Sequence, residues 1–208
     1  MHIDYSNKLN IENLNIVFTT DNNFPKIENK RTISMNQIHS NKIDYFRGEI
    51  KNNQSLDGLI TSNKKYILEV SVADCMPIFI FDKKINYFGV IHVGWKGLAS
   101  GIIENSIEQL RNNKFSLKEV NVFIGPSISQ KNFEVKNDVM AFFNEKFSIV
   151  KNKKIFLSLQ GIAIDKFSAN GVKNIINIDE CTYDNNDYHS FRRNKTNKRM
   201  KGRIFYNE

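Results

Sequence analysis

One cysteine and two histidines stand at the ends of three apolar stretches of this chain, and together they could hold a metal ion. Cys75 follows the stretch that begins at Val70, His92 lies near the end of the next stretch, and His39 ends an earlier one. If these stretches are neighbouring strands, one edge of a sheet offers two imidazoles and a thiolate. Zinc binds such a set and keeps a fourth position for water, whose pKa then falls to about 7. The pattern therefore predicts a zinc site formed by His39, Cys75 and His92.

Three other interpretations use the same residues. A single cysteine at a strand end is most often a small core residue. Cys75 could instead be a nucleophile with His92 as its base, although a metal-bound thiolate is not free to attack. The nearby Met76 would suit a blue-copper site, but adjacent residues of a strand point to opposite faces. A multicopper enzyme needs more histidines than the four in this chain, so zinc is favoured over copper.

The alternation of side chains along a strand also governs Asp74. Cys75 would share a face with Ala73, so that Asp74 points to the other side of the sheet. A carboxylate in that position is a poor metal ligand, but it can move protons or orient the ligands. Asp74, Cys75 and His92 are therefore the candidate catalytic residues.

Two segments are candidates for binding an anion near this centre. Gly94-Trp95-Lys96-Gly97 joins a predicted strand to a predicted helix, where backbone N–H groups and a lysine can hold phosphate. An ordinary strand-to-helix turn has the same pattern. Arg192 and Arg193 can clamp a phosphate or a carboxylate through paired N–H groups, or they belong to a basic surface loop.

The elements that must position these residues follow from the periodicity of apolar side chains. Runs rich in β-branched and aromatic residues predict strands. These strands cover 16–20, 32–38, 43–46, 58–61, 66–72, 77–81, 87–93, 120–124, 175–178 and 203–206.

Helical spacing of apolar residues predicts helices over 98–111, 137–147 and 158–170, the last ended by Asn170-Gly171 as a left-handed cap. Residues 82–86 are short enough to join two strands as a hairpin. Strands dominate the first half and helices enter later, which predicts an α+β fold.

Size and composition favour one folded catalytic domain over residues 1–208, since 40% of the residues are hydrophobic. The net charge of +8 suits an anionic partner, but the lysines are scattered, as on an ordinary solvated surface. We find no signal-peptide pattern and no apolar run of roughly 20 residues that would cross a membrane. Two cysteines do not form a disulfide framework, so we expect a cytoplasmic protein with reduced thiols.

Several motifs occur in one order along the chain. The first four are Gln37-Ile38-His39-Ser40, Asp57-Gly58-Leu59-Ile60-Thr61, Ala73-Asp74-Cys75-Met76-Pro77 and His92-Val93-Gly94-Trp95-Lys96-Gly97. The later ones are Gly125-Pro126-Ser127-Ile128, Phe133-Glu134-Val135, Cys181-Thr182-Tyr183 and Ser190-Phe191-Arg192-Arg193. Together they resemble the laccase-domain (YfiH-like) proteins, also called the polyphenol oxidase or purine nucleoside phosphorylase family, from about residue 14 to 206.

The resemblance implies an α/β/β/α-layered fold with mixed sheets and a zinc ion held by His39, Cys75 and His92. It also implies phosphorolysis of adenosine, inosine, guanosine and S-methyl-5′-thioadenosine with inorganic phosphate, together with hydrolytic deamination of adenosine. Some bacterial members of the family are instead assigned an amidohydrolase activity that removes L-serine from UDP-N-acetylmuramyl-L-serine.

Five residues within these motifs are the candidate substrate- and phosphate-binding residues: Ser40, Lys96, Gly97, Arg192 and Arg193. Lys96 departs from the arginine that family members usually carry, and a single ammonium group cannot make a two-pronged contact with phosphate.

A non-enzymatic metal- or nucleic-acid-binding protein is the remaining alternative. No aromatic-rich RNA-binding motif accompanies the positive charge, so a nucleic-acid partner is disfavoured. A purine nucleoside and inorganic phosphate are the expected partners, and the sequence indicates no particular oligomeric state.

Overall fold

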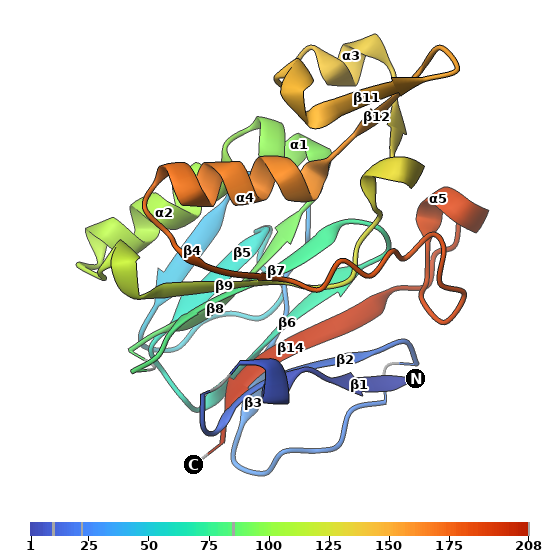
Figure 1. Ribbon diagram of the computed structural model, residues 1–208. Coiled ribbons are helices and arrows are strands. Elements are labelled where there is room, and N and C mark those ends of the chain that lie inside the picture. The colour runs from blue at the N-terminus through green and yellow to red at the C-terminus, as the bar shows by residue number, and fades with distance from the viewer. Residues whose placement is uncertain (10, 22, 85, 208) are drawn as a thin grey trace.

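The computed structural model describes residues 1–9, 11–21, 23–84 and 86–207, whose strands form three sheets (Figure 1). The six-stranded sheet has the order β13 (Asn174–Asn177), β9 (Val120–Ile124), β7 (Met76–Asp82), β8 (Phe88–Val93), β5 (Gly58–Thr61) and β4 (Ile43–Phe46). The five-stranded sheet has the order β1 (His2–Asp4), β2 (Leu14–Thr19), β14 (Met200–Tyr206), β6 (Tyr66–Val72) and β3 (Arg31–Ile33). A small third sheet consists of β10 (Glu134–Val135), β12 (Lys154–Leu157) and β11 (Ser148–Lys151).

Both large sheets are mixed. The pairs β13–β9 and β4–β5 are parallel in the first sheet, and β3–β6 is parallel in the second. The strands β7 and β8 pair antiparallel, as a hairpin requires. The predicted turn between them includes residue 85, which lies outside the described residues. The prediction of an α+β fold with mixed sheets is confirmed.

Successive side chains of a central strand point to opposite faces of the sheet, and they therefore pack into two different hydrophobic cores. Met76, Ile78 and Ile80 of β7 join the core beneath the helices. Phe79 and Phe81 of the same strand join the core between the two large sheets. A strand buried on both faces needs such a continuous apolar run.

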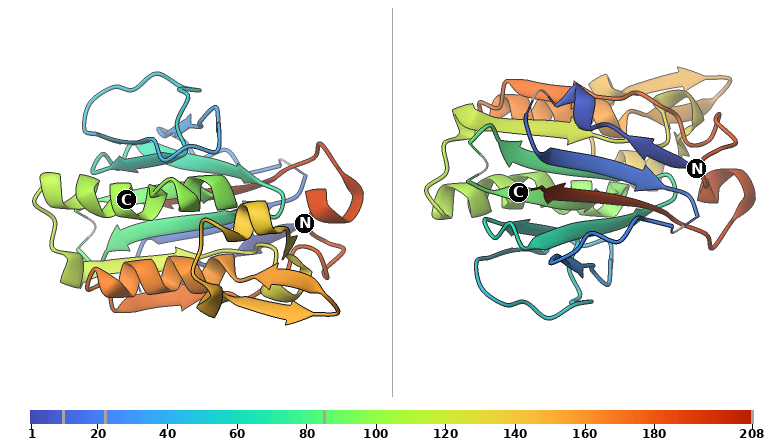
Figure 2. Two further views of the ribbon diagram at one scale, coloured as in Figure 1. Left: turned by 90° about the horizontal axis from the view of Figure 1, so that it is seen from above. Right: turned by 90° about the horizontal axis from the view of Figure 1, so that it is seen from below.

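Helices cover only the outer face of the six-stranded sheet in the described ranges (Figures 1 and 2). They are α1 (Trp95–Ala99), α2 (Ile102–Asn112) and α4 (Leu159–Ala169). On the outer face of the five-stranded sheet, Phe24 and Ile27 of a loop pack against Val17, Ile67 and Phe205. The outermost layer on that side is therefore a loop where the resemblance implied helices.

The helix predicted over 98–111 is two helices in the structure. The helix α1 begins at Trp95 with Gly94 as its N-cap, and α2 begins after Gly101. Gly101 has φ of +87°, a left-handed conformation that glycine adopts without a steric cost. The apolar stripe continues across the break, so the periodicity alone did not reveal it.

The helix predicted over 137–147 is also wrong in extent. Only α3 (Asn137–Met140) is α-helical, and a single 3-10 turn over Glu145–Phe147 follows. Val139 and Phe143 pack against the core, but Phe142 is 62% exposed. The hairpin of β11 and β12, which the sequence analysis did not predict, comes next and leads into α4 (Figure 2).

The helix predicted over 158–170 is confirmed as α4. The Ser158 side chain caps it by accepting a hydrogen bond from the N–H of Gly161. Gly171 beyond its end has φ of +89°, as expected of a left-handed cap. A further short helix, α5 (Phe191–Asn194), carries the two candidate arginines.

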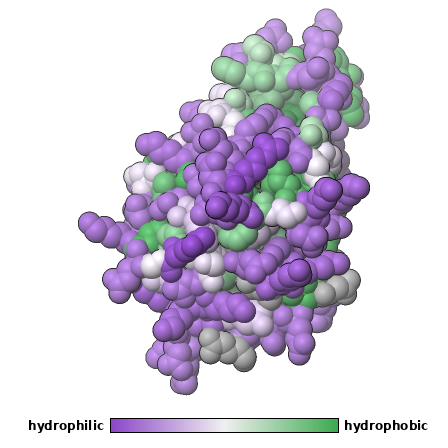
Figure 3. All heavy atoms as spheres, turned by 90° about the vertical axis from the view of Figure 1, so that its left-hand side faces the viewer, coloured by the Kyte–Doolittle hydropathy of each residue, from purple (hydrophilic) through white to green (hydrophobic). Residues whose placement is uncertain are grey.

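The surface is largely hydrophilic on the face shown in Figure 3, with an apolar area at the top of that view. Figure 1 places α3, β11 and β12 at this end of the molecule, where Phe142, Ile149 and Val150 are exposed. Among the residues described, no helix has both the length and the apolar character that crossing a bilayer requires.

Candidate metal centre

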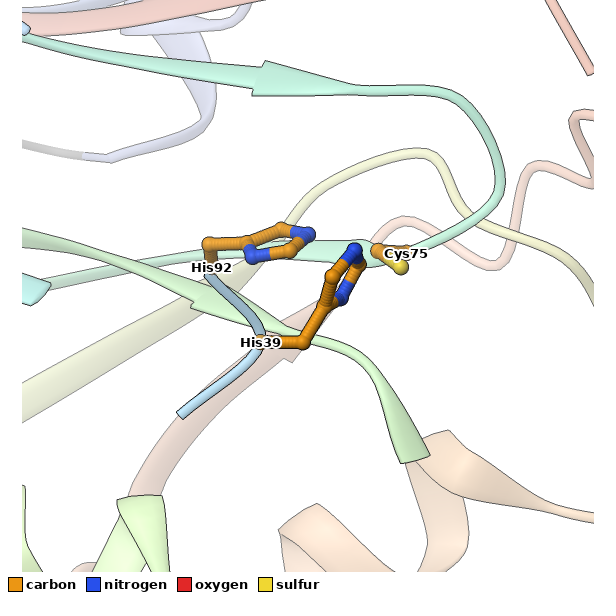
Figure 4. Close-up of side chains that lie close together, drawn as sticks. All are labelled: His39, Cys75 and His92. Atoms are coloured by element: carbon orange, nitrogen blue, oxygen red, sulfur yellow. The ribbon is translucent and has the colours of Figure 1, made fainter. Parts of the chain in front are cut away.

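The structure brings His39, Cys75 and His92 together from three different segments (Figure 4). Their ligand atoms all lie within 4.8 Å of one another. His92 belongs to β8, where it pairs with Pro77 of β7. Cys75 directly precedes β7, and His39 lies in the loop beyond β3. The predicted convergence of the three side chains is therefore present, although only His92 lies on a strand.

The strand predicted over 32–38 is too long. The regular strand β3 ends at Ile33, Met35 makes one isolated bridge, and His39 lies in a turn with φ of +57°. Beyond Ile33 the backbone no longer pairs with β6, and the side-chain amide of Gln37 takes over this contact. The amide donates to the carbonyl of Ser71 and accepts from its N–H group. Gln37, two residues before His39, is thereby tied to the end of β6.

Cys75 lies where the chain crosses from the five-stranded to the six-stranded sheet, between β6 and β7. Asp74 in this crossing has φ of +87°, which is strained for a residue with a side chain. Its conformation is held by three hydrogen bonds. The carboxylate accepts from the hydroxyl of Thr182 at 2.7 Å and from the backbone N–H of Arg192 at 2.6 Å, and the carbonyl accepts from Ile128 at 3.0 Å. Asp74 therefore fixes the position of Cys75.

Asp57 is the residue that orders the two histidines, and its role was missed in the sequence analysis. The carboxylate is completely buried and accepts the backbone N–H groups of His39 and Ser40 and the hydroxyl of Ser40. It also lies 2.8 Å from Nδ1 of His92. Because Asp57 can only accept there, Nδ1 of His92 carries a proton and Nε2 is directed to the metal position. A carboxylate directly before the largely apolar strand β5 was the signal in the sequence that could have revealed this role.

The charges at the centre follow from these contacts. Burial raises the pKa of the Cys75 thiol, but hydrogen bonds with His39 and His92 outweigh it and lower the value to about 6. Burial lowers the pKa of His92, but hydrogen bonds with Asp57 and Cys75 outweigh it and raise the value to about 9. Burial of Asp57 is likewise outweighed by hydrogen bonds from His92 and Ser40, so its pKa is lowered. Without a metal ion, the imidazolium of His92 therefore lies between two negative charges, the thiolate of Cys75 and the carboxylate of Asp57.

This donor set fits zinc. Bond lengths of about 2.0 to 2.3 Å place the donors of a tetrahedral site about 3.5 Å apart, so a small contraction of the group would close it around the ion. The thiol is already ionised near neutral pH, and thiolate and imidazole are preferred zinc ligands. His39 is exposed and all three residues line a cavity, so a fourth ligand could reach an ion held by them from that cavity.

Zinc binding should release protons in a pH-dependent way. At a pH midway between the pKa values of Cys75 and His92, the thiol is ionised and the imidazole is protonated. Zinc must displace the proton of His92, so we expect about one proton released per ion, fewer above pH 9 and more below pH 6. Calorimetric titration in buffers of different ionisation enthalpy measures this number. Release of no proton midway between the two values would contradict the assigned charges.

Gly94 makes room for the metal ligands. A Cβ atom at this position would lie 3.0 Å from Sγ of Cys75 and 3.2 Å from Nδ1 of His39. Gly94→Ala is expected to weaken zinc binding roughly ten- to hundredfold, because such crowding costs about 1 to 3 kcal/mol. Gly48→Ala is the matched control, since its Cβ would have no neighbour within 4 Å. Competition with a chromophoric chelator measures both affinities, and equal values would show that Gly94 is not required.

The cavity above the metal position has a volume of about 580 Å³, within the usual range for small-molecule sites. Its lining includes Asp74 and the metal ligands, and four cationic side chains: Lys96, Arg192, Lys195 and Arg199. The guanidinium carbon of Arg192 lies 5.1 Å from the centre of the Phe133 ring. Positive charge beside a metal position suits an anionic substrate. Lys195 and Arg199 were not among the predicted site residues.

Three of the predicted substrate-binding residues do not line this cavity. Ser40 is bonded to Asp57, and Gly97 packs closely on the carbonyl of Ser40, which a Cβ would approach to 2.9 Å. The guanidinium of Arg193 donates to the carbonyls of Thr182, Tyr183, Asn185 and Tyr188. Ser40, Gly97 and Arg193 therefore stabilise the loops around the cavity through these contacts and do not face a ligand in it.

Comparison with known proteins places the chain in a family. A family model described as "Multi-copper polyphenol oxidoreductase laccase" matches residues 12–206. Over 176 residues the chain is 31% identical to "Purine nucleoside phosphorylase Cj1217c" of Campylobacter jejuni, covering 82% of this chain and 75% of that protein. It is 33% identical over 159 residues to "Purine nucleoside phosphorylase RP494" of Rickettsia prowazekii, covering 73% and 65%.

The crystal structure of the Bacillus licheniformis hypothetical protein YfiH has the same fold, with a TM-score of 0.81 at 19% identity over 93% of each chain. The ordered sequence motifs, the match of the family model over nearly the whole chain and the shared fold lead to one conclusion: the chain belongs to the laccase-domain, YfiH-like family.

Proposed function

We propose that this chain is a cytoplasmic, zinc-dependent purine nucleoside phosphorylase whose single catalytic domain spans residues 1–208. The observation that carries the proposal is the set of two imidazoles and one thiolate at the base of a cavity with a cationic lining. The names of the relatives from Campylobacter jejuni and Rickettsia prowazekii support this substrate class. The preferred substrates would be adenosine, inosine, guanosine and S-methyl-5′-thioadenosine.

The proposed metal is zinc, although the family description names copper. The chain has four histidines, of which only His39 and His92 belong to the cluster. Met76, the nearest methionine in sequence, packs in the core beneath the helices. A multicopper centre needs more imidazoles than this, whereas zinc needs only the three donors found and a free corner.

In phosphorolysis, an oxygen of phosphate attacks C1′ of the ribose, the C1′–N9 bond breaks, and the proton that the phosphate gives up goes to the departing purine. Zinc at the three donors would supply Lewis-acid chemistry. Lys96 and Arg192, with Lys195 and Arg199, would hold the phosphate in the cavity and offset its charge. We assign Asp74 to positioning rather than to proton transfer, because both carboxylate oxygens accept hydrogen bonds from the protein.

Deamination of adenosine at the same centre is the second part of the proposal. It requires a water molecule at C6 of adenine in place of phosphate at C1′, and the open cavity beside the three donors can admit either. The two reactions are separable, because only phosphorolysis depends on phosphate.

Chromatographic analysis of the products tests the proposal. Zinc-loaded protein with inosine should form hypoxanthine and ribose 1-phosphate only when phosphate is present, and adenosine without phosphate should yield inosine. The His39→Ala variant is the negative control for both. Absence of phosphate-dependent product from intact, zinc-loaded protein would defeat the phosphorylase proposal. Release of serine from UDP-N-acetylmuramyl-L-serine under the same conditions would establish the amidohydrolase instead.

A further inference from the structure

A second cavity, of about 710 Å³, lies between α4 and the β11–β12 hairpin. It shares no lining residue with the cavity at the metal centre. Its volume is within the range of small-molecule sites. The proposed phosphorylase reaction makes no use of this cavity.

A buried glutamine offers an unused acceptor to this cavity. Gln160 is 8% exposed, and its Nε2 donates to the hydroxyl of Ser127 and to the carbonyl of Ile128, both at 2.8 Å. Because a carbonyl can only accept, the orientation of the amide is fixed, and Oε1 points the other way. No described residue donates to Oε1 of Gln160. In the described ranges, the hydroxyl of Tyr87 is the one side-chain atom that is both fully buried and without a partner, so Oε1 of Gln160 must retain some exposed surface. Because Gln160 lines the second cavity, we take that surface to face the cavity.

The rest of the lining combines positive charge with an apolar wall. Lys131, Lys151 and Lys154 outnumber the single carboxylate, that of Asp179. Lys131 and Lys154 form surface ion pairs, whereas Lys151 forms none with the described residues.

Phe156 of β12 and Ile164 of α4 provide apolar contact surface in the same cavity. A ligand that matches all three features has a flat apolar body, an amino group and an anionic group.

We propose that this cavity binds a purine nucleoside monophosphate. The base would lie against Phe156 and Ile164, its exocyclic amino group would donate to Oε1 of Gln160, and its phosphate would lie at Lys151. This site is independent of the metal centre and of the reaction proposed there.

Titration of the zinc-loaded protein with adenosine 5′-monophosphate, followed by amide NMR and calorimetry, tests the site. We expect shifts of the amides of Gly161 and Asn152. Lys151→Gln should weaken binding roughly tenfold, as expected for one lost charged contact. The matched control is Lys153→Gln on the same hairpin, which does not line the cavity. Ile164→Trp should fill the cavity and abolish these shifts, with the fold of each variant checked by circular dichroism.

Two results would overturn the proposal. Shifts confined to the amides of Gly94 and Trp95 would place the nucleotide only at the metal centre. Equal affinity for inorganic phosphate alone would show an unspecific anion site. The His39→Ala variant should retain the shift of the Gly161 amide. If phosphorolysis is absent while that shift persists, only the function proposed for the metal centre is lost.

Discussion

Cys75→Ala is expected to lose the bound zinc and to lower kcat/KM for phosphorolysis of inosine roughly a thousandfold or more. The variant removes the only sulfur donor of the cluster. A catalytic metal contributes several kcal/mol to transition-state stabilisation, and each 1.4 kcal/mol or so corresponds to a factor of ten in rate. Metal analysis of the purified variant and initial-rate measurements check both parts.

The chain contains its own control for this experiment. Cys181, the second free cysteine, is also partly buried, but it lies outside the cluster and accepts hydrogen bonds from Ser129 and Asn132. Cys181→Ala should retain the zinc and the activity. A Cys75→Ala protein that keeps both would show that the sulfur is not a ligand.

Asp57→Asn is expected to weaken zinc binding roughly 10- to 100-fold and to lower the free energy of unfolding by about 3 kcal/mol or more. All the groups around the Asp57 carboxylate are donors, namely the N–H groups of His39 and Ser40 and Nδ1 of His92. The NH2 group of an asparagine would face these donors and could not accept their hydrogen bonds. The tautomer of His92 would no longer be fixed. Chelator competition measures the zinc affinity, and denaturant titration measures the stability.

Asp82→Asn separates the two effects of that variant. Asp82 is a buried carboxylate in the same sheet, at the end of β7 opposite to Cys75, and it accepts two hydrogen bonds from Asn86. This variant should lose stability but bind zinc normally. If it loses zinc affinity as strongly as Asp57→Asn does, the effect of Asp57 is one of general stability rather than of orientation.

The cluster of candidate metal ligands could be predicted from the sequence because chemistry limits the choices. Thiolate and imidazole donors are few in this chain, and each candidate stands at the end of an apolar stretch. The local structure around them could not be predicted as well. His39 lies in a left-handed turn rather than on a strand, because Gln37 and Asp57 tie the chain there through long-range hydrogen bonds. No periodicity reports such contacts.

The same limit applies to the substrate-binding residues. Arg192 and Arg193 are equivalent in sequence, but only Arg192 lines the cavity, while Arg193 is held by four backbone carbonyls. The carbonyls of residues 182–188 hold Arg193 away from the cavity, whereas the guanidinium of Arg192 donates to the carbonyls of Asn132 and Glu134 at the cavity wall. Apart from β1, which was not predicted, and β3, which ends earlier than predicted, the strands of the large sheets were predicted to within about three residues, because buried strands carry the strongest apolar patterns.

X-ray absorption at the zinc edge of the purified protein tests the central claim most directly. The account predicts one sulfur at about 2.3 Å and three nitrogen or oxygen neighbours at about 2.0 to 2.1 Å, one of them exchangeable with solvent. Two sulfur neighbours, no sulfur neighbour, or an ion absent from the native protein would contradict a centre formed by His39, Cys75 and His92.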